Sequence, residues 1–221
     1  MSTPENISSI PIDDVHHLCW SCKEEVGPGP FCKHCVKIQC VDDLSDYFRL
    51  FNLEKSYSIN EELLKKRFYD LSRQFHPDFY SIRSEAEKSI ARDNTAYLNT
   101  ALKVLMDPIK RADYLLSIMV GNTPGNPTPP RELLDEILEI GEILLGESLN
   151  ENQRSQLMET LKRFRELKNK LVQSLHPLFD RLLQNETKVA DQIESSLNNI
   201  KYLRTIIGRI EAALNHMENR K

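Results

Sequence analysis

The 221-residue sequence lacks several features that would point to common classes of protein. No apolar run approaches the ~20 residues needed to cross a bilayer, which argues against a membrane protein. Glycine occurs only seven times, and we find no glycine-rich phosphate loop and no nucleophile motif. No cysteine follows position 40, so the five cysteines, all between positions 19 and 40, predict one local site and not a chain-wide disulfide framework. The absence of a phosphate loop and of a nucleophile motif argues against an enzyme.

The first 18 residues also lack the pattern of a targeting peptide. A secretory signal begins with basic residues before an apolar core, and a mitochondrial presequence is rich in Arg and poor in acids. Residues 1–18 contain no Lys or Arg and three acids, Glu5, Asp13 and Asp14. Either the chain begins after processing or the protein is cytosolic. We expect residues 1–15 to form a disordered lead-in.

The overall charge does not favour a nucleic-acid partner. The formal net charge is −4, with 28% charged and 40% hydrophobic residues. Nucleic-acid binding normally needs a concentrated basic face, so we expect protein partners instead.

Composition divides the remaining chain into four zones. Residues 16–41 form a cysteine-rich module, and residues 43–120 and 131–221 carry helical patterns without β alternation. Between them, "GNTPGNPTPP" at 121–130 has four prolines and two glycines, as expected of a linker. The sequence therefore predicts an all-α protein with a small N-terminal module.

The first helical zone predicts a hairpin of two long helices. "SINE" (58–61) and "SEAE" (84–87) have the spacing of capping boxes at the two helix starts. Since a short connection leaves the helices antiparallel, "HPDFYSIR" (76–83) should lie at the tip of the hairpin. Pro77 explains the helix end but not the neighbouring residues. One apolar stripe of the first long helix consists of Leu64, Phe68, Leu71 and Phe75.

The second helical zone predicts a three-helix bundle. Its helices should cover about 131–146, 150–184 and 186–218. Pro177 should kink or break the middle one.

"CWSC" (19–22) and "CKHC" (32–35) predict a metal site. Two C-x-x-C pairs separated by nine residues can surround one Zn²⁺ with four thiolates, and four protein ligands leave no open position, so the zinc would be structural. An iron–sulfur cluster and a redox role of the C-x-x-C pairs stay open as alternatives. The expected ligands are Cys19, Cys22, Cys32 and Cys35, with His16, His17, His34 and Cys40 as nearby substitutes.

The order of these motifs resembles one known family. "DYFRLFNL" (46–53), a basic helix, "HPDFY" (76–80) and "NTAYLNTALKVLMDPIKRADYLL" (94–116) resemble a J-domain, specifically that of the HscB-type co-chaperones of iron–sulfur cluster biogenesis. The four-cysteine module resembles the N-terminal extension of the animal-type members.

The resemblance implies that residues 43–120 are a J-domain that stimulates the ATPase of a DnaK-type chaperone, with no enzymatic activity of its own. His76, Pro77 and Asp78 would press into the chaperone. The exposed face of the preceding helix would meet an acidic surface through Lys65, Lys66, Tyr69 and Arg73.

The resemblance also implies that residues 131–221 bind the scaffold on which iron–sulfur clusters are assembled. The implied binding residues are Leu134, Leu138, Glu139, Glu142 and Tyr202. Independently, seven apolar residues of this segment cover an arc of roughly 160°, wider than the ~100° of a core-facing stripe, so one edge is expected to be exposed. They are Leu133, Leu134, Ile137, Leu138, Ile140, Leu144 and Leu145. The alternative is that both leucines belong to the core. Asp135 stands where relatives carry an apolar residue, so the patch would be smaller or shifted.

The resemblance implies that the protein lies in the mitochondrial matrix. The N-terminus, which lacks a presequence pattern, favours the cytoplasm as the alternative. Two other functions compete with a co-chaperone: a zinc-ribbon nucleic-acid binder and a redox protein, each with helical appendages. A second copy of the chain is a further candidate partner.

Overall fold

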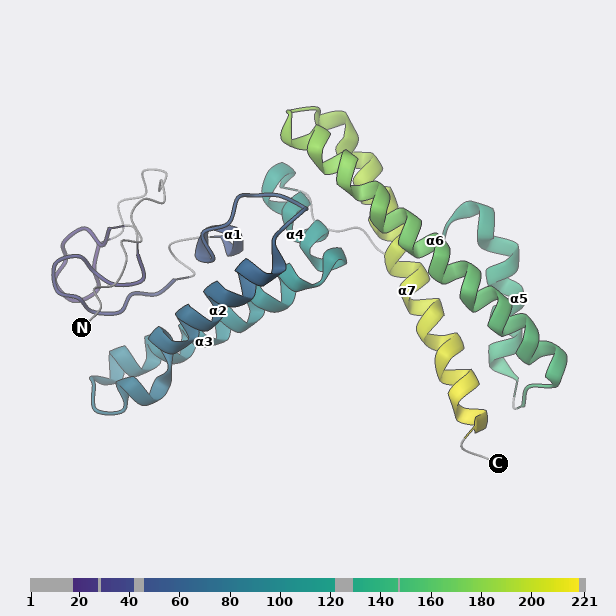
Figure 1. The fold of residues 1–221 in the computed structure, drawn as a ribbon, viewed down its shortest axis with the longest axis horizontal. Helices are drawn as coiled ribbons and strands as arrows, with labels where there is room; N and C mark the ends of the chain where they lie inside the picture. Colours follow the sequence, from purple (N-terminus) through teal and green to yellow (C-terminus); the bar gives the residue numbers. More distant parts are fainter. Residues whose placement is uncertain (1–17, 28, 42–45, 122–128, 147, 219–221) are drawn as a thin grey trace. The chain divides into compact units, whose positions relative to one another are not determined.

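The all-α prediction is confirmed. The computed structural model describes residues 18–27, 29–41, 46–121, 129–146 and 148–218. Over these residues it has seven α-helices and three short 3₁₀ helices, and its β pairing is limited to two isolated bridges (Figure 1). None of the described helices is both long and apolar enough to cross a membrane. The predicted lead-in at 1–15, and residues 122–128 of the linker predicted at 121–130, lie outside the described residues.

The chain divides into two compact units. Unit 1 contains the described residues up to Lys55 and Ile59–Met106, and unit 2 contains Ser56–Ser58 and the described residues from Asp107 onward. Helix α4 (Pro108–Val120) therefore belongs to unit 2, whereas the sequence grouped it with residues 43–120. The functional border at 121–130 stays a prediction.

Unit 1 contains the predicted helical hairpin. After the short α1 (Tyr47–Leu50), α2 (Glu61–Phe75) and α3 (Glu85–Met106) lie side by side, joined by the 3₁₀ helix η1 (Pro77–Tyr80) (Figure 1). The Thr95 hydroxyl of α3 shares its proton between the carbonyl of Ala91 at 2.8 Å, in its own helix, and that of Phe75 at 3.2 Å, at the end of α2. The apolar core of this unit includes Phe48, Phe51, Leu64, Phe75, Leu98 and Leu105.

One of the two predicted capping boxes is confirmed, and the other is wrong. At the start of α3, the Ser84 hydroxyl donates to the carboxylate of Glu87 at 2.7 Å, and the Glu87 N–H donates back to the hydroxyl oxygen at 3.3 Å. At the start of α2 the cap is Asn60, whose side chain accepts from the N–H of Leu63 at 3.0 Å. Ser58 instead hydrogen-bonds His176 Nδ1 at 2.8 Å, a contact that local spacing does not reveal.

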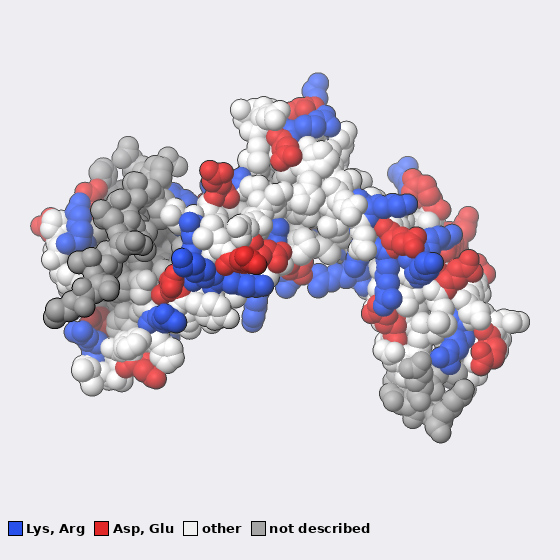
Figure 2. Space-filling view, in the orientation of Figure 1, with Lys and Arg blue, Asp and Glu red and all other residues white. Residues whose placement is uncertain are grey.

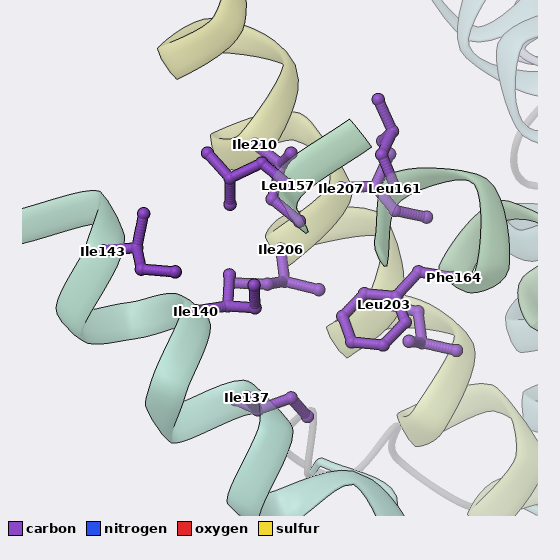
Figure 3. Close-up of a cluster of buried hydrophobic side chains, with 10 residues drawn as sticks. All are labelled: Ile137, Ile140, Ile143, Leu157, Leu161, Phe164, Leu203, Ile206, Ile207 and Ile210. Atoms are coloured by element: carbon purple, nitrogen blue, oxygen red, sulfur yellow. The ribbon is translucent and has the colours of Figure 1, made fainter. Parts of the chain in front are cut away.

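Unit 2 contains the predicted three-helix bundle, in addition to α4. Helix α5 (Leu134–Leu145) follows the 3₁₀ helix η2 (Arg131–Leu133), and α6 (Glu151–Leu183) is joined to α7 (Ala190–Glu218) through η3 (Thr187–Val189). Residues spaced by three or four positions on each helix meet in one core, each adding about 1.5–3 kcal/mol of hydrophobic stabilisation when fully buried. Figure 3 shows this core, made of Ile137, Ile140, Ile143, Leu157, Leu161, Phe164, Leu203, Ile206, Ile207 and Ile210.

The sequence predicted a kink or a break at Pro177. There is no break, since the 33-residue α6 runs from Glu151 to Leu183 with Pro177 inside it. Pro177 itself is exposed, while Leu175 and Phe179 on either side are fully buried. Burial of these neighbours holds the helix together across the missing backbone N–H.

Candidate functional site

The four predicted cysteines come together at the N-terminal module. Their sulfur atoms all lie within 4.8 Å of one another, with Cys19 Sγ 3.5 Å from Cys35 Sγ and Cys22 Sγ 3.6 Å from Cys32 Sγ. Among the described residues, neither His34 nor Cys40 joins the cluster; His16 and His17 lie outside these residues.

The two C-x-x-C segments fold as matching loops. In the first, Cys19 Sγ accepts from the N–H of Ser21 at 3.4 Å, and the loop ends at Lys23 with φ +65°. In the second, Cys32 Sγ accepts from the N–H of His34 at 3.4 Å. Val36 ends this loop with φ +60°. The backbone therefore turns both pairs of sulfurs toward one point.

The donor set fits one tetrahedral metal ion. Four thiolates at about 2.3 Å from Zn²⁺ would place their sulfurs about 3.8 Å apart, close to the spacing observed between the two loops. The geometry supports a metal ion, and four thiolates leave it no open coordination position.

The thiols of this cluster differ in acidity. Burial raises the pKa of Cys19, but the backbone N–H groups of Cys22 and Ser21 and the neighbouring thiols outweigh it, and the pKa falls to about 6. The pKa of Cys32 is also lowered, chiefly by backbone N–H groups. The backbone at Glu24 lowers the pKa of Cys22, but burial and the adjacent thiols raise it to about 12. Each loop thus supplies one acidic thiol, and a bound cation would ionise the others.

The tripeptide predicted to contact a chaperone forms the exposed turn after α2. His76 ends α2, and its Nδ1 accepts from the N–H of Asp78 at 3.4 Å. The side chains of His76 and Asp78 are 53% and 88% exposed. The turn is anchored by buried Tyr80, whose hydroxyl donates to the carbonyl of Gln74 at 3.0 Å. Tyr80 thus anchors the turn from the inside, while the side chains of His76 and Asp78 remain exposed.

The predicted basic face of α2 is also exposed. Lys66, Tyr69 and Arg73 are spaced by three and four residues and so share one side of the helix. Lys65 adjoins this side and is likewise exposed. All four residues are exposed on α2. Arg73 lies in the last turn before the tripeptide, whereas Lys65 and Lys66 lie about three helical turns before it.

The predicted patch on α5 is exposed as the apolar arc suggested. Leu134 and Leu138 are 41% and 66% exposed, which excludes the alternative that they are core residues. Glu142 is exposed, and Glu139 accepts from the side chain of Gln156 on α6 at 2.8 Å. Tyr202 on α7 differs from these four, because it is half-buried against the bundle core.

Three exposed apolar residues beside these sites were missed. Phe79 and Ile82 flank the tripeptide turn, and Leu145 lies seven residues beyond Leu138 on α5. Adjacency to the tripeptide could have revealed Phe79, and helical spacing could have revealed Leu145.

On the face that Figure 2 displays, the charges of the described residues do not form a large basic area. Figure 2 shows acidic and basic side chains interspersed over the face it displays. In the cysteine module, Lys33 pairs with Glu25 at 3.4 Å and Lys37 with Glu87 at 3.9 Å. Nucleic-acid binding needs lysines that are available to contact phosphates, so lysines paired with carboxylates argue against the nucleic-acid alternative.

Sequence comparison connects the chain to the resemblance described above. A model of the DnaJ domain matches residues 46–114. The iron–sulfur cluster co-chaperone protein HscB of Homo sapiens is 36% identical over 132 residues, 57% of this chain and 56% of that protein. The HscB homolog of Arabidopsis thaliana is 35% identical over 150 residues, 66% of this chain and 59% of that protein. The matched part spans less than two thirds of either relative.

Solved structures show the same relationship over more of the chain. The crystal structure of human co-chaperone protein HscB matches with a TM-score of 0.71 and 27% identity, covering 89% of this chain and 98% of that one. The chaperone HscB from Vibrio cholerae matches with a TM-score of 0.59 and 28% identity, covering 77% and 99%. The resemblance inferred from the motifs is confirmed.

Proposed function

We propose that this chain, which is similar to the HscB co-chaperones, stimulates ATP hydrolysis by a DnaK-type chaperone through its J-domain. The observation that carries the proposal is the exposed His76–Asp78 turn at the end of a basic helix. The side chains of His76 and Asp78 are both exposed on this turn, as a binding surface requires. The turn would therefore act by binding one conformation of the ATPase more tightly than the other.

Electrostatics would assist this encounter. Lys65, Lys66 and Arg73 are exposed positive charges spread along α2 before the turn, which suits an acidic surface on the chaperone. Attraction between exposed charges is screened over about 8–10 Å at physiological salt, so the association should weaken as salt rises.

Single-turnover ATPase of the chaperone tests the proposal. We expect His76→Gln to abolish stimulation, because the imidazole is a contact group, while helical content and scaffold binding stay unchanged. His176→Gln is the matched control: His176 also precedes a proline and is exposed, but it lies on α6. Normal stimulation by His76→Gln would refute the assignment.

We further propose that α5 holds the iron–sulfur cluster scaffold protein. Exposed Leu134 and Leu138 with acidic Glu139 and Glu142 form an apolar patch with a charged border, the composition of a protein-binding surface. Half-buried Tyr202 on α7 completes the set implied by the family.

Scaffold binding by titration calorimetry tests this patch. We expect Leu138→Ser to weaken binding at least tenfold, as for a central apolar contact worth more than about 1.4 kcal/mol. Leu183→Ser is the control, because Leu183 is also an exposed leucine but lies at the C-terminal end of α6 and not on α5. This variant should bind the scaffold as wild type does. Equal affinities for both variants would place the scaffold elsewhere.

The metal at the four cysteines is proposed to be one structural Zn²⁺. The spacing of the sulfurs supports a single ion, and a small module with few apolar residues needs metal to fold. Metal analysis of the purified chain should give one zinc; fully reactive thiols without metal would support the redox alternative.

The compartment stays a prediction. The mitochondrial matrix is proposed from the family alone, and imaging of the tagged full-length gene product in cells distinguishes it from the cytoplasm.

A further inference from the structure

A buried asparagine connects the cysteine module to the helical hairpin. Asn94 lies in the middle of α3 and is only 1% exposed. Its Oδ1 accepts from the N–H of Val41 at 3.0 Å, and its Nδ2 donates to the carbonyl of Gln39 at 2.8 Å. A buried amide is costly unless its groups are hydrogen-bonded, so Asn94 is specific for this backbone segment.

Gln39 connects the same segment to the sulfur cluster. Its side chain is 4% exposed, and Nε2 lies 3.4 Å from Cys19 Sγ as a donor. The two hydrogens of Nε2 are shared among Cys19 Sγ and the carbonyls of Lys37 at 2.8 Å and Ile38 at 3.1 Å. Oε1 accepts from the N–H of Trp20 at 3.4 Å. The backbone N–H of Gln39 donates to the carbonyl of Pro30 at 2.9 Å, and Pro30 lies just before the second C-x-x-C pair. One residue therefore touches both halves of the module.

A charged contact runs alongside this connection. Lys37 lies 3.9 Å from the carboxylate of Glu87 on α3 and 5.1 Å from the centre of the Trp20 ring. Glu87 is itself buried and bonded to Ser84 at the start of α3. The module thus contacts α3 at two points, seven residues or two turns apart.

We propose that Gln39 and Asn94 couple metal binding at the four cysteines to the stability of α3. Gln39 positions and stabilises the Cys19 thiolate from outside the ligand set, as hydrogen-bonding groups around metal sites do. Asn94 holds the Gln39 backbone in the position from which its side chain reaches the sulfur. Coupling is reciprocal: whatever metal binding adds to the order of α3, the contacts from α3 add to the affinity for metal. The inference rests on metal binding as proposed above, but not on the chaperone or scaffold.

The consequence concerns the helix that supports the tripeptide turn. The end of α2 is tied to α3 through Thr95, the residue after Asn94. A chain without metal should therefore have a less protected α3 and a less fixed His76–Asp78 turn.

Metal affinity measured on the full-length chain tests the coupling. Zn²⁺ binding is followed by competition with a chromophoric chelator. We expect Gln39→Leu to weaken binding about tenfold or more, the usual effect of removing such a supporting group. Asn94→Leu should weaken it about fivefold, although Asn94 is not a ligand. Asn99→Leu is the matched control, because Asn99 is exposed on α3 and bonds only within its helix, to Thr95.

Two further measurements separate coupling from misfolding. The Co²⁺-loaded variants should keep the absorption spectrum of four thiolate ligands. Hydrogen exchange of the wild-type chain, which needs no substitution, should show faster exchange around Asn94 when metal is removed. The inference would be overturned if Gln39→Leu and Asn94→Leu bound Zn²⁺ with wild-type affinity. It would also be overturned if hydrogen exchange in α3 were the same with and without metal. Absence of any metal binding would overturn both it and the proposed zinc site.

Discussion

At the scale of single residues, Asp107 shows how one side chain serves two structural purposes. It caps α4 by accepting from the N–H groups of Ile109 at 2.9 Å and Lys110 at 3.3 Å. The same carboxylate accepts from Arg204 on α7 at 3.0 Å. Burial raises the pKa of Asp107, but the backbone N–H of Lys110 and the Arg204 guanidinium outweigh it, so the pKa lies below its usual value.

This pKa shift predicts a specific dependence of stability on pH. Because the folded-state pKa is lowered, the carboxylate stabilises the fold above the ordinary Asp pKa of about 4, and this stabilisation is lost as the pH falls through the folded-state value. Asp107→Ala should lower the free energy of unfolding by about 1 kcal/mol at pH 7, the typical value of a lost cap. Asp107→Asn keeps a capping oxygen, so it should cost less than Asp107→Ala at pH 7.

Urea unfolding between pH 7 and pH 3 measures both effects. The difference in unfolding free energy between wild type and Asp107→Asn should shrink toward acid pH. A difference independent of pH would mean that the charge of Asp107 does not contribute.

Residue-scale predictions succeeded where local chemistry decides. Pro77 prevents α2 from continuing, so an exposed turn at His76–Asp78 could be predicted from the tripeptide sequence alone. The bonds of Asn94 to Gln39 and Val41 could not, since they join positions more than 50 residues apart. Nothing in local spacing marks such a pair.

At the scale of elements, α5 has two different faces. Ile137, Ile140 and Ile143 point into the bundle core, as Figure 3 shows, while Leu134 and Leu138 face solvent. Gly141 lies in the interior of this helix, and a Cβ placed on it would meet nothing within 4 Å. Close packing against the described part of the chain therefore does not require glycine at this position.

Gly141→Ala should therefore raise the free energy of unfolding by about 1 kcal/mol, because alanine loses less backbone entropy in a helix and meets no clash here. Gly121 is the matched comparison: it caps α4 with φ +68°, a conformation that strains alanine. Gly121→Ala should destabilise. Chemical unfolding of the two variants checks this, and stabilisation by both, or by neither, would contradict it.

The two errors in element boundaries have tertiary causes. Ser58 and Asn60 both suit a helix start, but the Ser58 hydroxyl is engaged by His176. Pro177 should interrupt α6, but burial of Leu175 and Phe179 outweighs its cost. Helix identities followed from periodicity, whereas these details depend on contacts with distant segments.

At the scale of the whole molecule, the two proposed binding surfaces belong to different compact units. The His76–Asp78 turn is in unit 1, and the exposed leucines of α5 are in unit 2. Helix α4 packs with unit 2, which the sequence did not reveal because α4 follows the hairpin without a break in pattern. Because the surfaces lie in separate units, we expect a substitution that removes binding at one surface to leave binding at the other unchanged.

The most direct measurement is chaperone ATPase stimulation with and without scaffold protein. We expect His76→Gln to fail in both conditions. Leu138→Ser should stimulate like wild type without scaffold but lose the additional stimulation that bound scaffold provides. Wild-type stimulation by His76→Gln, or equal losses by Leu138→Ser in both conditions, would contradict a co-chaperone with two separable surfaces.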